Sequence, residues 1–190
     1  MSGRIVLITG GARSGKSTFA ERYAASQGKA ISYIATAQVL DDEMRNRVAL
    51  HRQRRPAAWQ TYEAPFAADE AMLQAGKHAD VILFDCLTLY ISNLLLAAEG
   101  LPTAAARCEQ VLSQIDQLSD SASSCGAMVI IVTNEVGMGI VPDNALAREY
   151  RDIAGWANQK IASRADEVYL VISGLAVEIK QLSTNVSKEV

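Results

Sequence analysis

The chain has 190 residues, of which 49% are hydrophobic and 21% are charged, and its formal net charge is -3. This size and composition are typical of one globular domain, and the slightly negative charge excludes a general field that would draw the chain to nucleic acid or to an anionic membrane surface. The three cysteines form no C-x-x-C pair, so neither a zinc site nor a disulfide framework is indicated, and a reduced cytoplasmic chain is the simplest interpretation.

Short apolar runs alternate with helical patterns along the chain. Runs without polar alternation predict strands that are covered on both faces, and they lie at residues 5–8, 31–35, 81–85, 128–133 and 168–172. Helical patterns lie at residues 16–27, about 40–54, about 66–76, about 104–121 and about 144–164. This alternation predicts an α/β fold with a mainly parallel sheet flanked by helices. We expect one domain over residues 1–182 and a polar tail at 183–190.

Two further apolar segments stand out between these elements. Residues 87–98 are too few to span a bilayer, which takes about 20 residues, so we expect a buried or subunit-interface helix and no membrane span. The loop at 136–141 carries apolar residues that are unusual for a free loop. It is expected to pack against a ligand or a neighbouring subunit.

Residues 10–17 fit the P-loop pattern G-x-x-x-x-G-K-[ST], with Gly10, Gly15, Lys16 and Ser17 at the fixed positions. The pattern has a physical basis. A buried strand ends, the glycines let the backbone curl, and its N–H groups form an anion nest at the positive end of the next helix. The lysine can then reach the terminal phosphates, and the serine hydroxyl can bind Mg²⁺. A glycine-rich turn without a special role is the alternative, but the predicted strand before it and helix after it favour a nucleoside-triphosphate site.

Ligands of parallel α/β sheets bind beyond the carboxyl ends of the strands. This rule points to Thr36, Asp85, Asn134 and Glu135, which end or follow predicted strands. An acid at such a strand end commonly holds the Mg²⁺ of a P-loop protein, so Asp85 is the second predicted metal ligand. The alternative is that Asp85 caps a helix that begins near Thr88.

The predicted helix at 40–54 leads into a cluster of one histidine and three arginines. His51 continues the apolar stripe of this helix, which favours a partly buried packing residue with the arginines on a solvated face. A second interpretation rests on chemistry, because Arg52, Arg54 and Arg55 suit the oxygens of phosphates. Their positive charge also disfavours imidazolium, which leaves His51 neutral and able to act as a nucleophile. The residues alone leave both interpretations open.

Seven motifs between residues 4 and 180 match the pattern of one family. They are Thr-Gly-Gly-Ala-Arg-Ser-Gly-Lys-Ser at 9–17, Tyr-Ile-Ala-Thr-Ala-Gln at 33–38, Leu-Asp-Asp-Glu-Met at 40–44, His51 with Arg55-Pro56-Ala57 and Trp59, Val-Thr-Asn-Glu-Val-Gly-Met-Gly-Ile-Val-Pro at 132–142, Arg151-Asp152-Ile153-Ala154-Gly155, and Asp166-Glu167-Val168 with Ser173-Gly174. With these motifs the chain resembles the bifunctional adenosylcobinamide kinase / adenosylcobinamide-phosphate guanylyltransferase family of cobalamin biosynthesis. The motifs are far more specific than a P-loop alone.

The resemblance implies a RecA-like P-loop NTPase fold that carries two reactions. The first phosphorylates the aminopropanol hydroxyl of adenosylcobinamide with ATP or GTP. The second transfers GMP from GTP onto that phosphate, which releases pyrophosphate and gives adenosylcobinamide-GDP. In the family the guanylyl group passes through a histidine, and the matching residue here is His51. This implication outweighs the packing interpretation of that residue.

The resemblance also implies the ligands and partners. Nucleotide contacts map onto Gly10, Gly11, Ala12, Arg13, Ser14, Gly15, Lys16, Ser17, Ala35, Thr36, Ala37, Arg52, Gln53, Arg54, Arg55, Glu63 and Asp85. Mg²⁺ is the implied cofactor, bound to Ser17 and Asp85, with GTP and ATP as substrates. The expected partner is a small-molecule corrinoid, not nucleic acid, and a homotrimer with sites between its subunits is implied.

Two alternatives to a bifunctional enzyme stay open. One is a P-loop kinase that has lost the transferase activity. The other is a nucleotide-gated switch or assembly protein, in which hydrolysis drives partner exchange. The chain has no long effector insert, and a switch would leave the cluster at His51 without a role.

Overall fold

A computed structural model of the protein describes residues 3–38, 42, 45 and 56–184. Most of the predicted helix at 40–54 lies outside these residues, and so does His51. The predicted nucleotide contacts Arg52, Gln53, Arg54 and Arg55 also lie outside them, together with the greater part of the expected tail at 183–190.

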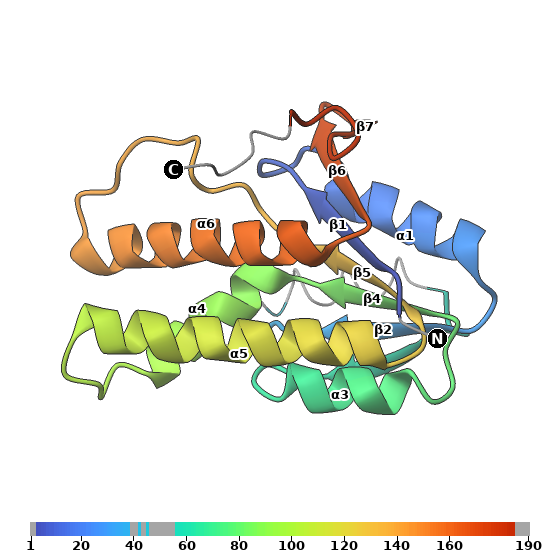
Figure 1. The fold of residues 1–190 in the computed structure, drawn as a ribbon, viewed down its shortest axis with the longest axis horizontal. Coiled ribbons are helices and arrows are strands. Elements are labelled where there is room, and N and C mark those ends of the chain that lie inside the picture. The colour runs from blue at the N-terminus through green and yellow to red at the C-terminus, as the bar shows by residue number, and fades with distance from the viewer. Residues whose placement is uncertain (1–2, 39–41, 43–44, 46–55, 185–190) are drawn as a thin grey trace.

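A seven-stranded sheet forms the centre of the molecule (Figure 1). Its strands are β1 (Ile5–Thr9), β2 (Ile31–Ala35), β3 (Gln60–Glu63), β4 (Val81–Asp85), β5 (Met128–Val132), β6 (Glu167–Ile172) and β7 (Leu175–Glu178). They lie in the order β3-β2-β4-β5-β1-β6-β7, and every neighbouring pair is parallel except β6 with β7. Strand β1 therefore lies between β5 and β6, and two strands, β4 and β5, separate it from β2, as expected for a RecA-like fold.

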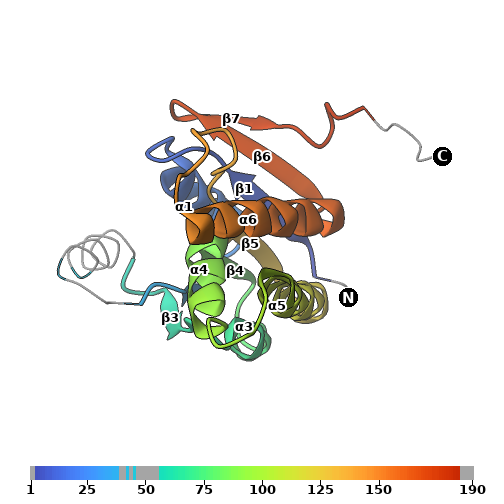
Figure 2. The same cartoon turned by 90° about the vertical axis from the view of Figure 1, so that its left-hand side faces the viewer.

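The five described helices cover both faces of the sheet (Figures 1 and 2). They are α1 (Lys16–Gln27), α3 (Ala68–Ala75), α4 (Leu87–Ala97), α5 (Ala104–Ser124) and α6 (Ala145–Arg164). Successive residues of a strand point to opposite faces. In β4, Ile82 and Phe84 join the core under α3, α4, α5 and α6, whereas Val81 and Leu83 join the core under α1. Burial on both faces explains why the strands read as continuous apolar runs.

Most elements agree with the sequence prediction, and the differences have physical causes. The short strand β7 was not predicted, because it is an edge strand whose residues alternate between exposed and half-buried positions. The 87–98 segment forms helix α4, and six of its residues are buried within its own chain, so the buried interpretation of that segment holds. Among the described residues, no helix is both long enough and apolar enough to cross a membrane.

The strand register aligns the carboxyl ends that position the site. Ala35 pairs with Glu63 on one side and with Asp85 on the other. Asp85 in turn pairs with Val132, and Val132 pairs with Ile8 of β1. The predicted site residues at the ends of β1, β2, β3 and β4 thus lie along one edge of the sheet, which faces the viewer in Figure 2.

Candidate nucleotide site at the carboxyl edge of the sheet

The P-loop connects the end of β1 to the first residue of α1. Gly15 has φ 97° at the N-cap of α1, a left-handed conformation that favours glycine. Arg13 has φ 56°, and the Ser14 N–H donates to the Gly11 carbonyl at 3.3 Å. The loop therefore curls tightly before the helix begins at Lys16, as the sequence predicts for an anion nest at a helix N-terminus.

Neighbouring segments hold this loop in place. The Gly174 N–H, in the turn between β6 and β7, donates to the Ser14 carbonyl at 2.8 Å, and the Glu135 N–H donates to the Gly10 carbonyl at 3.1 Å. A Cβ atom added at Gly10 would lie 2.4 Å from the Val171 carbonyl oxygen. Glycine is therefore required at position 10 by a close approach to β6, in addition to the P-loop pattern.

Lys16 is a buried cation in the first turn of α1. Its side chain is 8% exposed, and its Nζ donates to the Gly11 carbonyl at 3.1 Å, so the amine is folded back over the loop. Burial lowers the pKa of Lys16, and the nearby Cys86 and Asp85 oppose this effect. The positive charge is thus held between the P-loop and the end of β4, where it can contact an anion that lies in the loop.

Asp85 ends β4 and does not cap the following helix. Helix α4 begins at Leu87 with Cys86 as its N-cap, and no side-chain cap bond is found among the described residues. The capping alternative for Asp85 is therefore wrong. Its Oδ2 instead accepts a hydrogen bond of 2.8 Å from the hydroxyl of Tyr33, a buried residue of β2. This bond orients the carboxylate at the edge that the P-loop also reaches.

The predicted contacts on β2 and β3 lie beside Asp85. Ala35 and Ala37 are half-buried, and Glu63 is exposed at the end of β3. Thr36 is fully buried, and its hydroxyl accepts from the Cys86 N–H and donates to the Cys86 carbonyl, both at 2.8 Å. Both hydrogen bonds of the Thr36 hydroxyl therefore go to the backbone of Cys86. The Thr36 N–H also donates to the Asp85 carbonyl at 3.3 Å, so Thr36 joins the end of β2 to the end of β4.

Among the predicted site residues that the structure describes, all lie at this edge of the sheet. Ser17 is half-buried in the first turn of α1, one residue after Lys16. Sequence reasoning did not single out Tyr33 as a partner of Asp85. Its position in the 33–38 motif was the available signal, but the two residues are 52 positions apart, and no local pattern reveals such a pair.

The loop after β5 presents apolar side chains to the surface. Met138, Ile140 and Val141 are 84%, 95% and 62% exposed. The backbone of this loop is fixed by α6. The Arg151 guanidinium donates to the Gly137 carbonyl, and Arg148 donates to the carbonyls of Pro142 and Asp143. Arg148 and Arg151 therefore hold this loop against α6.

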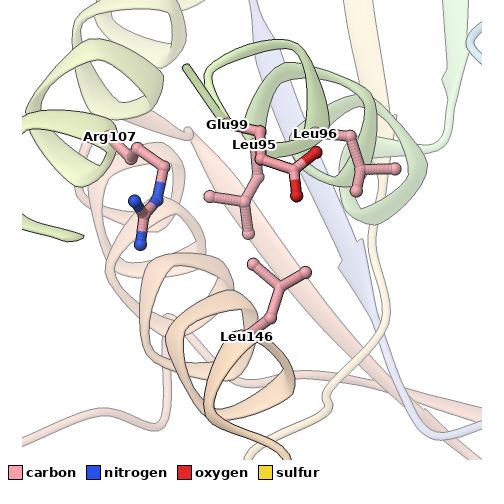
Figure 3. A pocket seen from close by; sticks show the side chains of 5 residues that line it. All are labelled: Leu95, Leu96, Glu99, Arg107 and Leu146. Atoms are coloured by element: carbon pink, nitrogen blue, oxygen red, sulfur yellow. The ribbon is translucent and has the colours of Figure 1, made fainter. Parts of the chain in front are cut away.

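A cavity of about 180 Å³ lies between α4, α5 and α6 (Figure 3). Its lining residues are Leu95, Leu96, Glu99, Arg107 and Leu146. Arg107 forms two hydrogen bonds with Glu149, at 2.9 and 2.6 Å, so its charge is already paired. Leu146 continues the apolar stripe of α6, which by itself predicts burial, but it is 39% exposed, because the first turn of α6 extends past the edge of the sheet (Figure 1).

The chain is similar to a set of named proteins over nearly its whole length. A family described as cobinamide kinase / cobinamide phosphate guanyltransferase matches residues 6–179. The bifunctional adenosylcobalamin biosynthesis protein CobU of Salmonella typhimurium is 45% identical over 181 residues, which cover 93% of this chain and 99% of that protein. The protein of the same name from Escherichia coli is 44% identical with the same coverage. CobP of Pseudomonas aeruginosa is 42% identical over 92% of this chain and 96% of its own.

Among solved structures, the chain is similar to the RadB recombinase, with a TM-score of 0.47 and 16% identity over 89% of this chain and 74% of that one. The family match covers the P-loop, the ends of β2, β3 and β4, and the loop that precedes α6. The chain belongs to the cobinamide kinase / cobinamide phosphate guanyltransferase family.

Proposed function

We propose that this protein phosphorylates the aminopropanol hydroxyl of adenosylcobinamide with ATP or GTP. It then transfers GMP from GTP onto that phosphate, which gives adenosylcobinamide-GDP and pyrophosphate. The observation that carries the proposal is the placement of a buried lysine between a tightly curled P-loop and an oriented carboxylate. Lys16 contacts Gly11, and Asp85 lies close enough to influence its pKa. A triphosphate in the loop would meet backbone N–H groups and one ammonium group, which stabilise the charge that develops during phosphoryl transfer.

Mg²⁺ fits the residues at this edge. No cluster of three or more His, Cys, Asp and Glu side chains that would enclose a metal ion occurs in the described part of the chain. Mg²⁺ is usually bound through one or two protein oxygens, water and substrate phosphates, and the Ser17 hydroxyl and the Asp85 carboxylate offer such oxygens. The ion would neutralise charge on the transferred phosphoryl group. The Tyr33 hydroxyl holds the carboxylate in a fixed orientation for this role.

His51 is the proposed nucleophile of the second reaction. A neutral imidazole nitrogen attacks the α-phosphorus of GTP, and the bond from that phosphorus to the bridging oxygen breaks as pyrophosphate leaves. A phosphate oxygen of adenosylcobinamide phosphate then attacks the same phosphorus and displaces the imidazole. Arg52, Arg54 and Arg55 are proposed to contact the nucleotide during this step, because a guanidinium group can donate two hydrogen bonds to the oxygens of one phosphate. Gln53, which lies among them in the sequence, is proposed as a further contact from the family resemblance alone.

We further propose that the protein is a cytoplasmic homotrimer with its sites between subunits. The support is the exposed apolar surface of the 137–141 loop, which lies on the same edge as the P-loop. Monomeric proteins rarely expose large apolar side chains in such groups. A neighbouring subunit is the proposed cover, and the corrinoid is proposed to enter between the two.

A product assay tests the function. The protein is incubated with adenosylcobinamide, Mg²⁺ and either ATP or GTP. The corrinoid products are then separated by chromatography and identified by mass spectrometry. We expect adenosylcobinamide phosphate with either nucleotide, and conversion to adenosylcobinamide-GDP when GTP is present. Adenosylcobinamide phosphate that accumulates in the presence of GTP, without adenosylcobinamide-GDP, would indicate that the protein is a kinase without transferase activity. GTP-dependent binding of a partner protein without any corrinoid product would indicate a switch.

A further inference from the structure

One buried amide connects the ends of β2 and β3 to helix α4. Asn93 lies in α4 and is 6% exposed. Its Nδ2 donates to the Thr36 carbonyl at 2.7 Å and to the Pro65 carbonyl at 3.0 Å. Thr36 directly follows β2, and Pro65 lies two residues after β3. Both hydrogens of the Asn93 amide are therefore used. They bind the segments that follow β2 and β3, which lie 57 and 28 positions before Asn93 in the chain.

Thr36 extends this connection to β4. Its hydroxyl binds both the N–H and the carbonyl of Cys86, each at 2.8 Å. Cys86 directly follows Asp85 in the chain. Asn93 is therefore connected to Asp85 through Thr36, at the end of β2, and Cys86, at the end of β4. A second side chain of α4 acts in parallel, because the Tyr90 hydroxyl donates to the Phe66 carbonyl at 2.7 Å.

Burial alone does not explain an asparagine at this position. Helix α4 is mainly apolar, and a leucine at position 93 would serve the core at least as well, since a buried amide is costly unless it is hydrogen-bonded. Both bonds of the amide go to main-chain carbonyls next to proposed nucleotide contacts. Those contacts are Ala35, Thr36 and Ala37 on β2, Glu63 on β3 and, through Cys86, Asp85 on β4.

We propose that Asn93 is a positioning residue for the nucleotide. Its amide fixes the ends of β2, β3 and β4 relative to one another, and so places the contacts on these strands around the bound triphosphate. This inference rests on the proposed function of the site. Without the amide, the buried Thr36 carbonyl and the partly buried Pro65 carbonyl lose this donor, and the segments that follow β2 and β3 are held less firmly. Shifts of about 1 Å are enough to weaken a preorganised site.

The test compares Asn93→Ala and the isosteric Asn93→Asp with Leu118→Ala, a core variant in α5 that removes a fully buried side chain away from the strand ends. The affinity for a fluorescent GTP analogue is measured with Mg²⁺ at a temperature below every melting transition. We expect both Asn93 variants to bind the analogue about tenfold more weakly than the wild type. Leu118→Ala should lower the melting temperature at least as much, because it leaves a cavity, but should bind the analogue as the wild type does.

A second variant tests the path. Thr36→Val removes the hydroxyl that binds Cys86, which is the second link between Asn93 and Asp85. It should therefore also weaken GTP binding. If Asn93 acts through Thr36, the loss in Asn93→Ala/Thr36→Val is smaller than the product of the two single losses. A loss of affinity in the double variant equal to the product of the two single losses would overturn the proposal. So would a loss in Leu118→Ala as large as that in Asn93→Ala. Normal affinity in a folded Asn93→Ala protein would overturn it and leave the proposed function intact, whereas failure of the wild type to bind GTP would reject the proposed function itself.

Discussion

The two halves of the candidate site hold their chemical groups by different means. The P-loop half is built from backbone. Glycines at positions 10 and 15 allow the curl, and main-chain hydrogen bonds from Glu135 and Gly174 hold it. The half formed by β2 and β4 is built from side chains, because Tyr33 orients Asp85 and Thr36 joins the two strands. We therefore expect the first half to be sensitive to added atoms and the second to lost hydrogen bonds.

The largest expected effect is that of Lys16→Met. Loss of the buried ammonium should lower the turnover of both reactions by about 100-fold or more, as removal of a charge-stabilising donor does elsewhere. The same change should not lower the melting temperature of the nucleotide-free protein, since burial disfavours the charged amine and lowers its pKa. The cost of burying this charge is full below the folded-state pKa, and it fades as the pH rises through that pKa toward the unfolded-state value.

Product assays and thermal melts with and without GTP check these two outcomes. Arg22→Met is the matched control, because Arg22 is exposed on the same helix. It should leave turnover unchanged. A Lys16→Met protein with wild-type turnover would remove Lys16 from the site.

Gly10→Ala tests the sensitivity of the P-loop half to one added methyl group. The new Cβ would lie 2.4 Å from the Val171 carbonyl and 2.7 Å from the Ser14 hydroxyl, so the loop or β6 has to move. We expect a loss of about 1–3 kcal/mol in the free energy of unfolding and weaker GTP binding. Gly155→Ala in α6 is a control of opposite sign. Outside its chain neighbours and the backbone of its own helix, no described atom lies within 4 Å of its added Cβ. Alanine stabilises a helix interior by about 0.5–1 kcal/mol relative to glycine. Urea unfolding measures the free energy of unfolding of both variants. An unchanged free energy of unfolding in Gly10→Ala would contradict the close approach of Gly10 to Val171.

Tyr33→Phe tests the side-chain half with the loss of one hydroxyl. Asp85 loses a donor that orients it, so the Mg²⁺ concentration for half-maximal kinase rate should rise several-fold, up to about tenfold. Tyr23→Phe is the matched control, because it also removes a hydroxyl that donates to a carboxylate, that of Glu167, outside the site. Its Mg²⁺ dependence should equal that of the wild type. An equal shift in both variants would mean that Tyr33 acts on stability alone.

The smallest expected effect concerns Cys86, beside Asp85 in the side-chain half. Burial, followed by the charge of Asp85, raises the pKa of this thiol to about 11. At pH 8 the native protein should therefore react with iodoacetamide at Cys108 and Cys125 before it reacts at Cys86. Reaction at Cys86 should rise only as the pH approaches 11, because the thiolate is the nucleophile. Mass spectrometry of peptides after timed quenching measures this order, and early labelling of Cys86 would contradict its burial.

The same difference explains what could be predicted from the sequence. The P-loop half depends on residues that are close together in the chain, so its pattern was recognisable, and helix α1 has the predicted bounds of Lys16–Gln27. The other half depends on pairs such as Tyr33 with Asp85 and Asn93 with Thr36, which are more than 50 positions apart. The sequence therefore left two roles open for Asp85. The fold excludes it as the N-cap of α4, where Cys86 stands, and its role as a metal ligand stays a prediction.

Misjudged positions have a related cause. Leu146 fits the apolar stripe of α6, but the sheet does not extend under the first turn of that helix, so periodicity alone wrongly predicts its burial. Strand β7 is held by pairing with β6 at an edge, and its apolar run of three residues, Leu175 to Val177, is too short to predict a strand. The role of His51, by contrast, came from the family resemblance and stays a prediction.

A labelling experiment tests most directly whether a nucleotide held by the P-loop and the imidazole of His51 react with each other. The protein is incubated with GTP labelled at the α-phosphate and Mg²⁺, without corrinoid, and the protein-bound label is measured before and after acid treatment. We expect an acid-labile label that is lost in His51→Ala and is released as adenosylcobinamide-GDP when adenosylcobinamide phosphate is added. A label of undiminished size in His51→Ala would contradict it.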